Sequence, residues 1–264
     1  MIRKLRFTLG FISYVIRAKS RFRVHSPFVY KFYTDVILRK ESNEVFDRIE
    51  YLRRSLLRQR SLLETTDFGT GASGNAYKTR FRQVKHVTRY SSIGPRYGRL
   101  LHRLTTFASP AEILEIGTAM GISTMYIASA APGSHLVTME GCAVIAEKAH
   151  ENFISMGLEN IEVDLGNFDQ LLGKSLDRFP KLDLVFIDGN HKKESTLKYF
   201  KQILPKLHEN SILVIDDIHW SQGMEQAWKE ITRSNKVSIS IDIYKMGILL
   251  FRKEIAKEDF VLKF

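Results

Sequence analysis

The chain has 264 residues, of which 44% are hydrophobic, enough for one large domain or for one domain with an extension. No apolar run reaches about 18 residues, so the sequence predicts no membrane-spanning helix. The single cysteine, Cys142, excludes an internal disulfide. A reducing compartment suits this composition, and we therefore predict a cytoplasmic protein.

The net charge of +11 is unevenly distributed along the chain. Residues 1–110 contain 23 Lys and Arg against 7 Asp and Glu, whereas residues 111–264 contain 17 against 22. A basic front of this kind predicts an anionic partner, such as a phosphorylated substrate, nucleic acid or a membrane surface. The alternative is a solvated basic face without a partner, and the charge pattern alone leaves both open.

Residues 1–60 are predicted to form mainly helices. The stretch FTLGFISYVI, between Arg6 and Arg17, predicts an amphipathic helix that packs on the domain or lies on a membrane surface. It resembles the core of a signal peptide, but no small-residue cleavage site follows it, so we expect an amphipathic helix instead. A new helix is expected to begin at Ser26 and Pro27, with Ser26 as its N-cap.

A glycine cluster, DFGTGASG, extends from Asp67 to Gly74. The residues before it form a poor strand pattern, and no acidic residue follows at a distance suited to a ribose. We therefore interpret the cluster as a loop, with glycines that can serve as a lid hinge, leading into basic helices over residues 77–106. The predicted division is a basic, mainly helical extension over residues 1–108 and a catalytic domain over residues 109–264.

The stretch from Ala111 to Glu140 predicts a strand, a glycine turn, a helix and a second strand. Gly117 and Gly121 allow a sharp turn and a close approach of the backbone to a ligand. Glu140 ends the second strand, about 20 residues beyond the turn, where an acid accepts hydrogen bonds from a ribose diol. A nucleoside cofactor is therefore expected at the carboxyl ends of these strands.

The runs LEIGTAMGIS and TMEG resemble motifs I and II of class I S-adenosylmethionine (SAM) methyltransferases. Only two of the three glycines of a dinucleotide fingerprint are present, which argues against a pyrophosphate ligand. The resemblance implies SAM as cofactor, with its methionine end beside Glu115 and Gly117 and its ribose on Glu140. The family's adenine position falls after the third strand, IEVDL. The expected cofactor-binding residues are Glu115, Gly117, Thr118, Ala119, Gly121, Ser123, Glu140, Gly141, Asn167, Phe168 and Asp188.

From residue 109 onward, strands alternate with helices, which predicts a parallel sheet covered on both faces. VSISIDIY and MGILLFR, joined across Lys245, indicate a closing antiparallel hairpin. Together with the resemblance, this predicts an α/β fold: a Rossmann-like, seven-stranded, mostly parallel sheet preceded by a helical N-terminal extension.

Acidic residues follow two of the predicted strands. Asp188 ends the fourth strand, KLDLVFIDGN, and Asp216 and Asp217 end the fifth, SILVIDD. Carboxylates this close repel one another unless a cation joins them, and oxygen ligands favour Mg²⁺ or Ca²⁺. A metal site formed by Asp188, Asp216 and Asp217 is therefore predicted. Helix capping is the alternative function for a single acid in such a place.

This pattern is similar to that of catechol-type, metal-dependent O-methyltransferases, and the resemblance covers residues 109–252. DGNHKK and DDIHWSQGM look more like a bacterial branch of SAM methyltransferases. His191 stands where the family has its general-base lysine, and the predicted catalytic residues are His191, Asp188 and His219. The resemblance implies in-line methyl transfer to a small hydroxylated molecule, and the basic front is compatible with an anionic one.

The sequence leaves two other functions open. An RNA methyltransferase would use the basic front, but no RNA-binding module or aromatic-rich motif is visible, so nucleic acid is a less favoured partner. A non-catalytic SAM-binding protein, or one that contacts a membrane surface through residues 1–60, is the other alternative.

Overall fold

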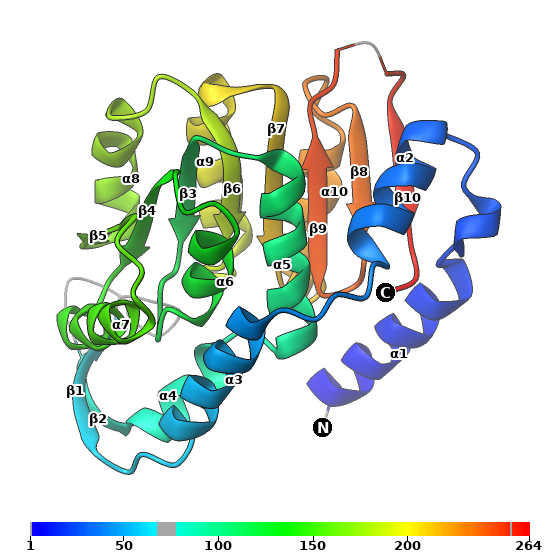
Figure 1. Ribbon diagram of the computed structural model, residues 1–264. Helices are drawn as coiled ribbons and strands as arrows, with labels where there is room; N and C mark the ends of the chain where they lie inside the picture. Colours follow the sequence, from blue (N-terminus) through cyan, green and yellow to red (C-terminus); the bar gives the residue numbers. More distant parts are fainter. Residues whose placement is uncertain (1, 68–77, 254) are drawn as a thin grey trace. The chain divides into compact units, whose positions relative to one another are not determined.

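The computed structural model describes residues 2–67, 78–253 and 255–264, with only the backbone of residues 2–7, 67 and 78. Two compact units are present (Figure 1): a terminal unit of Met1–Arg39 with Lys181–Phe264, and a middle unit of Lys40–Pro180. The predicted boundary between residues 108 and 109 stays a prediction. Apart from Asp67, the glycine cluster predicted to be a lid lies outside the described residues.

The middle unit begins with helix α3 and contains a hairpin and three strands of the main sheet. Strands β3, β4 and β5 are parallel and neighbour one another in that order, with Ile116 opposite Met139 and Glu140 opposite Leu165. The elements are α3 (Glu44–Leu56), β1 (Leu62–Asp67), β2 (Lys78–Gln83), α4 (Val84–Ser91), α5 (Pro95–Ala108), β3 (Glu112–Ile116), α6 (Ile122–Ala130), β4 (His135–Glu140), α7 (Ala143–Met156), β5 (Ile161–Leu165) and α8 (Phe168–Asp177).

The hairpin of β1 and β2 corrects the sequence-based prediction. Residues 62–67 form a strand, and the helical region begins at Val84 instead of Tyr77. The two strands pair antiparallel, and the Thr65 hydroxyl donates to the Arg80 carbonyl at 2.9 Å. Neither strand sequence contains an apolar run. The large apolar side chains that are present, Leu62 and Phe81, are exposed. Their strand character comes from pairing with each other, which local periodicity does not reveal.

The terminal unit joins the two ends of the chain. Its strands follow the order β10-β8-β9-β7-β6; β6 and β7 are parallel, as are β8 and β10, while β9 is antiparallel to both β7 and β8. The elements are α1 (Ile2–Arg17), η1 (Arg21–Arg23), α2 (Pro27–Phe32), η2 (Tyr33–Ile37), β6 (Leu182–Ile187), α9 (Lys193–Ile203), η3 (Leu204–Lys206), β7 (Leu207–Asp216), α10 (Gln222–Thr232), β8 (Ile239–Asp242), β9 (Met246–Leu250) and β10 (Glu258–Val261).

These eight mostly parallel strands and their helices confirm the predicted fold class, the closing hairpin of β8 and β9, and the helical N-terminal region. The predicted count of seven strands is corrected by β10, which pairs with β8 at the sheet edge. Within β10 only Phe260 is buried, so its sequence carries little strand pattern. Just beyond it, the Leu262 carbonyl accepts a hydrogen bond from the Tyr14 hydroxyl at 2.5 Å, which joins the two chain ends.

Helix α10 packs on the hairpin through Trp228, which was predicted to be a core residue. Trp228, Met224 and Ile231 are buried, as the spacing of one helix face requires. A Cβ at position 247 would lie 2.4 Å from the Trp228 ring, so glycine in β9 is what allows the indole this close. The prediction of a core tryptophan is confirmed.

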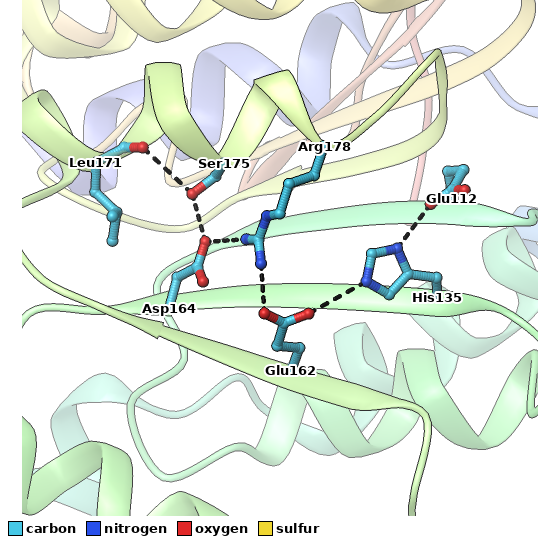
Figure 2. A network of polar contacts seen from close by, with 7 residues as sticks. All are labelled: Glu112, His135, Glu162, Asp164, Leu171, Ser175 and Arg178. Carbon is cyan, nitrogen blue, oxygen red and sulfur yellow. Dashed lines mark hydrogen bonds and ion pairs between the residues drawn. The ribbon is translucent and has the colours of Figure 1, made fainter.

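A polar network connects α8 to the three strands of the middle unit. Figure 2 shows Arg178 between Asp164 and Glu162, with His135 continuing the chain of contacts to Glu112. Glu112 and His135 are the first residues of β3 and β4, so this network lies at the amino ends of those strands. The glycine turn lies at the opposite ends. Residues of this network therefore serve as controls for variants of the candidate site.

Candidate active site

The turn between β3 and α6 is held in an unusual backbone conformation. Gly117, Ala119 and Gly121 all have positive φ, of 107°, 47° and 76°. A Cβ on Gly121 would also lie 2.3 Å from the Phe153 ring, so both the conformation and the space require glycine there. The amide groups of Gly117 and Thr118 donate to the Met139 carbonyl, at 3.1 and 3.0 Å, and tie the turn to β4.

Glu140, the predicted ribose ligand, is joined to this turn. Its two carboxylate oxygens accept hydrogen bonds from the Ala119 and Cys142 amides, each at 2.9 Å. Burial raises the pKa of Glu140, while these amides and that of Gly141 act in the opposite direction. Each carboxylate oxygen has a second lone pair, so the group can still accept hydrogen bonds from a diol. The acid therefore sits where the sequence predicted, and its orientation is fixed by the turn.

Glu115, on β3, is completely buried among hydroxyl groups. Its Oε2 atom accepts hydrogen bonds from Thr124 and Thr138, at 2.5 and 2.7 Å. Its Oε1 atom is buried and accepts no hydrogen bond from the described residues. Burial raises the pKa of Glu115 to about 7, although the hydroxyls of Ser123, Thr124 and Thr138 oppose this. A buried acceptor without a partner is costly, and an ammonium group is the kind of ligand that would satisfy it.

The remaining predicted cofactor residues lie close to this turn or follow β5. Thr118 and Thr138 share a hydrogen bond between their hydroxyls at 2.7 Å, and Thr118 and Ser123 are buried. Asn167 is the N-cap of α8, because its side chain accepts a hydrogen bond from the Asp169 amide at 2.9 Å. The capping function is therefore present, and the adenine contact predicted for Asn167 and Phe168 stays a prediction. The Gly166 amide donates to the Glu140 carbonyl at 2.9 Å, which holds this loop beside the acid.

In the terminal unit, Asp188 and His191 follow the fully buried strand β6. The His191 Nε2 atom lies 3.5 Å from Asp188 Oδ1. Asn190 and His191 both have positive φ, of 67° and 33°, and the His191 amide donates to the Gly189 carbonyl at 2.9 Å. This strained turn brings the imidazole back over Asp188, and strain of this kind is typical of functional sites.

Asp216 and Asp217 end β7, and a lysine lies between them. Lys245 Nζ is 2.8 Å from Asp216 Oδ2 and 3.9 Å from Asp217 Oδ1. The lysine comes from the turn between β8 and β9, and the pairing of Asp216 with Met246 in the sheet places it there. The Ile218 amide donates to the Lys245 carbonyl at 3.2 Å, which holds the two segments together.

The electrostatics of this cluster centre on Lys245. Burial alone would lower the pKa of its ammonium, but Asp216, Asp217 and Asp188 all raise it. Burial and the nearby Asp217 carboxylate raise the pKa of Asp216 to about 6, while Lys245 opposes the shift. Burial lowers the pKa of His191. The Asp217 carboxylate opposes this shift, and the Lys245 ammonium reinforces it. At neutral pH we therefore expect a charged lysine among three acids beside a neutral imidazole.

These residues do not fit the predicted Mg²⁺ or Ca²⁺. Within the described part of the chain, no group of three or more His, Cys, Asp or Glu side chains is arranged to hold a metal ion. Lys245 already supplies the positive charge that three neighbouring carboxylates need, and a lysine ammonium has no lone pair with which to bind a cation. Sequence reasoning treated Lys245 only as a hairpin residue. The register of β7 against β9 is the signal that identifies it as a member of the site.

His219 and Trp220 lie in different surroundings. His219 Nε2 is 2.8 Å from Asp242 Oδ2, its Nδ1 is 3.7 Å from Glu225 Oε1, and its ring stacks on Tyr244 at 5.2 Å between centroids. It lines a cavity of about 570 Å³ together with Arg17 of α1 and residues of α10. None of these contacts is with Asp188 or His191, and the catalytic function predicted for His219 stays a prediction. Trp220 is 47% exposed.

Comparison with known proteins shows what this chain is similar to. Residues 114–218 match a family of methyltransferase domains. A catechol O-methyltransferase of Mycobacterium tuberculosis is 30% identical over 134 residues, which are 48% of this chain and 57% of that protein. A catechol O-methyltransferase of Niastella koreensis is 29% identical over 136 residues, covering 48% of this chain and 58% of its own length. The chain thus spans little more than half the length of these relatives.

Solved structures share the fold over most of the chain. A methyltransferase of Podospora anserina, bound to S-adenosylhomocysteine (SAH), gives a TM-score of 0.61 at 13% identity and covers 87% of this chain and 97% of its own. An O-methyltransferase of Streptomyces achromogenes in complex with SAM gives a TM-score of 0.57 at 21% identity, and the match covers 85% of this chain and 96% of that one. At such identities the likeness establishes the fold alone.

Proposed function

We propose that this chain, whose residues 114–218 match a family of methyltransferase domains, is a SAM-dependent O-methyltransferase acting on a small hydroxylated acceptor. The observation that carries the proposal is the glycine turn. The turn orients the Glu140 carboxylate, and in the adjoining strand β3 a buried oxygen of Glu115 accepts no hydrogen bond from the described part of the chain. These two acids are complementary to the ammonium and to the ribose diol of an adenosyl amino acid. The names of the sequence relatives suggest catechols and related phenols as acceptors.

The reaction is a displacement in which atoms and charges balance. SAM, when bound, supplies a methyl group that is already activated by the positive charge of its sulfonium. The acceptor oxygen forms a bond to that carbon, the carbon–sulfur bond breaks, and its electron pair remains on sulfur to give SAH. The hydroxyl proton of the acceptor goes to a base. Holding the reactants in line supplies on the order of 7–11 kcal/mol of the barrier reduction, so the main work of the chain is positioning.

His191 is the proposed base. Its imidazole is held by the strained turn after β6, next to the Asp188 carboxylate. Its lowered pKa keeps it neutral at physiological pH, as a proton acceptor must be. Once protonated, the imidazolium would be stabilised by Asp188, which also orients the ring. Asp188 is thus the positioning partner of the base.

Lys245 takes the electrostatic function that the sequence assigned to a metal ion. Its ammonium neutralises Asp216 and Asp217 and can favour the oxyanion that forms as the acceptor loses its proton. No step of the proposed reaction passes through a metal. An RNA substrate is not favoured by any feature of the described residues.

The proposal is tested by measuring SAH formation by mass spectrometry with a panel of catechols, phenols and aliphatic alcohols. We expect methylated catechol or phenol from the wild-type chain, and Asp188→Ala should lower turnover by about 100-fold or more, as loss of an acid–base pair does. Glu209→Ala, which removes an exposed acid paired with Lys253 in the same unit, is the matched control and should retain activity. Absence of methyl transfer to every acceptor, by protein that binds SAH, would contradict the enzymatic part of the proposal.

Glu115 should make cofactor binding depend on pH. Its pKa is about 7 in the free protein, so the carboxylate is largely protonated below that pH and charged above it. The affinity for SAH, measured by calorimetry, should therefore rise by up to about tenfold per pH unit as the pH approaches 7 from below, and level off above it. Glu115→Gln should bind more weakly, with a flat profile.

The same ionisation affects stability in the opposite sense. A carboxyl whose folded-state pKa is raised contributes stability that is lost as the pH rises towards 7. Glu115→Gln should therefore gain thermal stability relative to the wild type above about pH 7. A pH profile of SAH binding that is unchanged in Glu115→Gln would contradict the assignment of Glu115 to the methionine end.

A further inference from the structure

Helix α1 has apolar side chains on two opposite faces. On one face, Tyr14 and Ala18 are buried and form a cluster with Tyr244. On the other, Leu9, Ile12 and Ile16 are 57%, 49% and 75% exposed. With about 100° between successive residues, these three side chains fall within an arc of roughly 60° on the outer side. The inner face accounts for the packing of α1 on the terminal unit, and the outer face has no such use.

Positive charge accompanies this exposed arc. Residues 2–23 contain seven Lys and Arg and no Asp or Glu. Four of these, Arg17, Lys19, Arg21 and Arg23, are exposed in the last turn of α1 and in the segment up to η1. Phe22 lies among them and is 78% exposed, with the Arg21 guanidinium 4.9 Å from the centre of its ring. Exposed apolar and basic side chains thus alternate along one short stretch.

We propose that the outer face of α1, together with η1, binds the surface of a bilayer that contains anionic lipids. An exposed apolar arc next to a purely basic segment is complementary to an acyl boundary beneath negative head groups. A second copy of the chain fits less well, because the same basic segment would be brought against itself. None of the described helices is long and apolar enough to span a bilayer, so the contact would lie along the surface. This inference does not depend on the proposed reaction.

The experiment is sedimentation of the full chain with vesicles of phosphatidylcholine alone and of phosphatidylcholine mixed with phosphatidylglycerol. We expect binding to the mixed vesicles that weakens with added salt, and little binding to phosphatidylcholine alone. The double variant Ile12→Ser and Ile16→Ser should lower the partition coefficient by about tenfold or more, because two apolar side chains no longer enter the boundary. Ile154→Ser, which changes a 66% exposed isoleucine on α7, is the matched control and should bind as the wild type does.

Reversing the charge of basic residues tests the electrostatic contribution to vesicle binding. Arg21→Glu with Arg23→Glu should abolish the preference for phosphatidylglycerol, whereas Lys174→Glu with Lys236→Glu makes the same charge change at other exposed positions and should retain it. Each variant is first checked for folding by circular dichroism. Equal binding to both kinds of vesicle, or binding unaffected by the Ile12 and Ile16 changes, would overturn the proposal. So would a dimer that these two changes dissociate, since the face would then join two copies of the chain.

Discussion

Replacing Lys245 with methionine is expected to lower the free energy of unfolding by about 3–5 kcal/mol at neutral pH, the usual cost of leaving a buried charge without its partner. The lysine ammonium is bonded to the buried Asp216 at 2.8 Å and lies within reach of two further acids. Methionine fills a similar volume but leaves these carboxylates to repel one another. The loss should shrink as the pH falls to about 6 and level off below it, because Asp216 without the lysine takes up its proton at a higher pH than the wild-type carboxyl, whose pKa is about 6.

Divalent ions provide the second measurement on this variant. In Lys245→Met the three acids lack a cation, so Mg²⁺ or Ca²⁺ should raise its melting temperature in a thermal-shift assay, while the wild type should show no such increase. The turnover of the wild type should also survive thorough chelation by EDTA. Lys253→Met, at an exposed lysine of the same unit, is the control for the loss of one charge. A wild-type enzyme stabilised by Mg²⁺ and inactivated by EDTA would restore the metal site predicted from the sequence.

Replacing Glu140 with alanine is expected to weaken binding of both SAM and SAH by about 100-fold or more, since each hydrogen bond to a charged group contributes about 1.5–3 kcal/mol. The carboxylate can accept hydrogen bonds from a diol. It also accepts hydrogen bonds from the Ala119 and Cys142 amides, each at 2.9 Å. Its removal therefore takes away a ligand and also loosens the turn that presents the others. Isothermal titration calorimetry measures the change.

Two controls separate binding from folding in this experiment. Glu140→Gln keeps one acceptor oxygen and should lose less affinity than Glu140→Ala. Glu162→Ala removes an acid on β5 from the network at the amino ends of the strands (Figure 2), and it should leave SAH binding unchanged. Wild-type affinity in a folded Glu140→Ala protein would place the cofactor elsewhere.

The sequence was sufficient where the chemistry is local. Gly117, Gly121 and Glu140 belong to one strand–helix–strand unit. Because the elements of this unit are consecutive and its strands pair side by side, their relative positions are strongly constrained. The alternation of strands and helices after residue 109 likewise predicted the fold class, and the spacing of Met224, Trp228 and Ile231 identified a core face. In each case the information lies within one or two consecutive elements.

Only the tertiary structure places a lysine beside the acidic cluster. The sequence correctly indicated that carboxylates at two strand ends need a positive charge, and their oxygen ligands favoured Mg²⁺ or Ca²⁺ as its source. Lys245 is 28 residues beyond Asp217 and reaches it through the antiparallel pairing of β7 with β9. The same holds for β10, which becomes a strand only by pairing with β8. The hydrophobic periodicity of a segment indicates only which of its own side chains are buried. The contacts of Lys245 and of β10 depend instead on which distant segment of the chain pairs beside them.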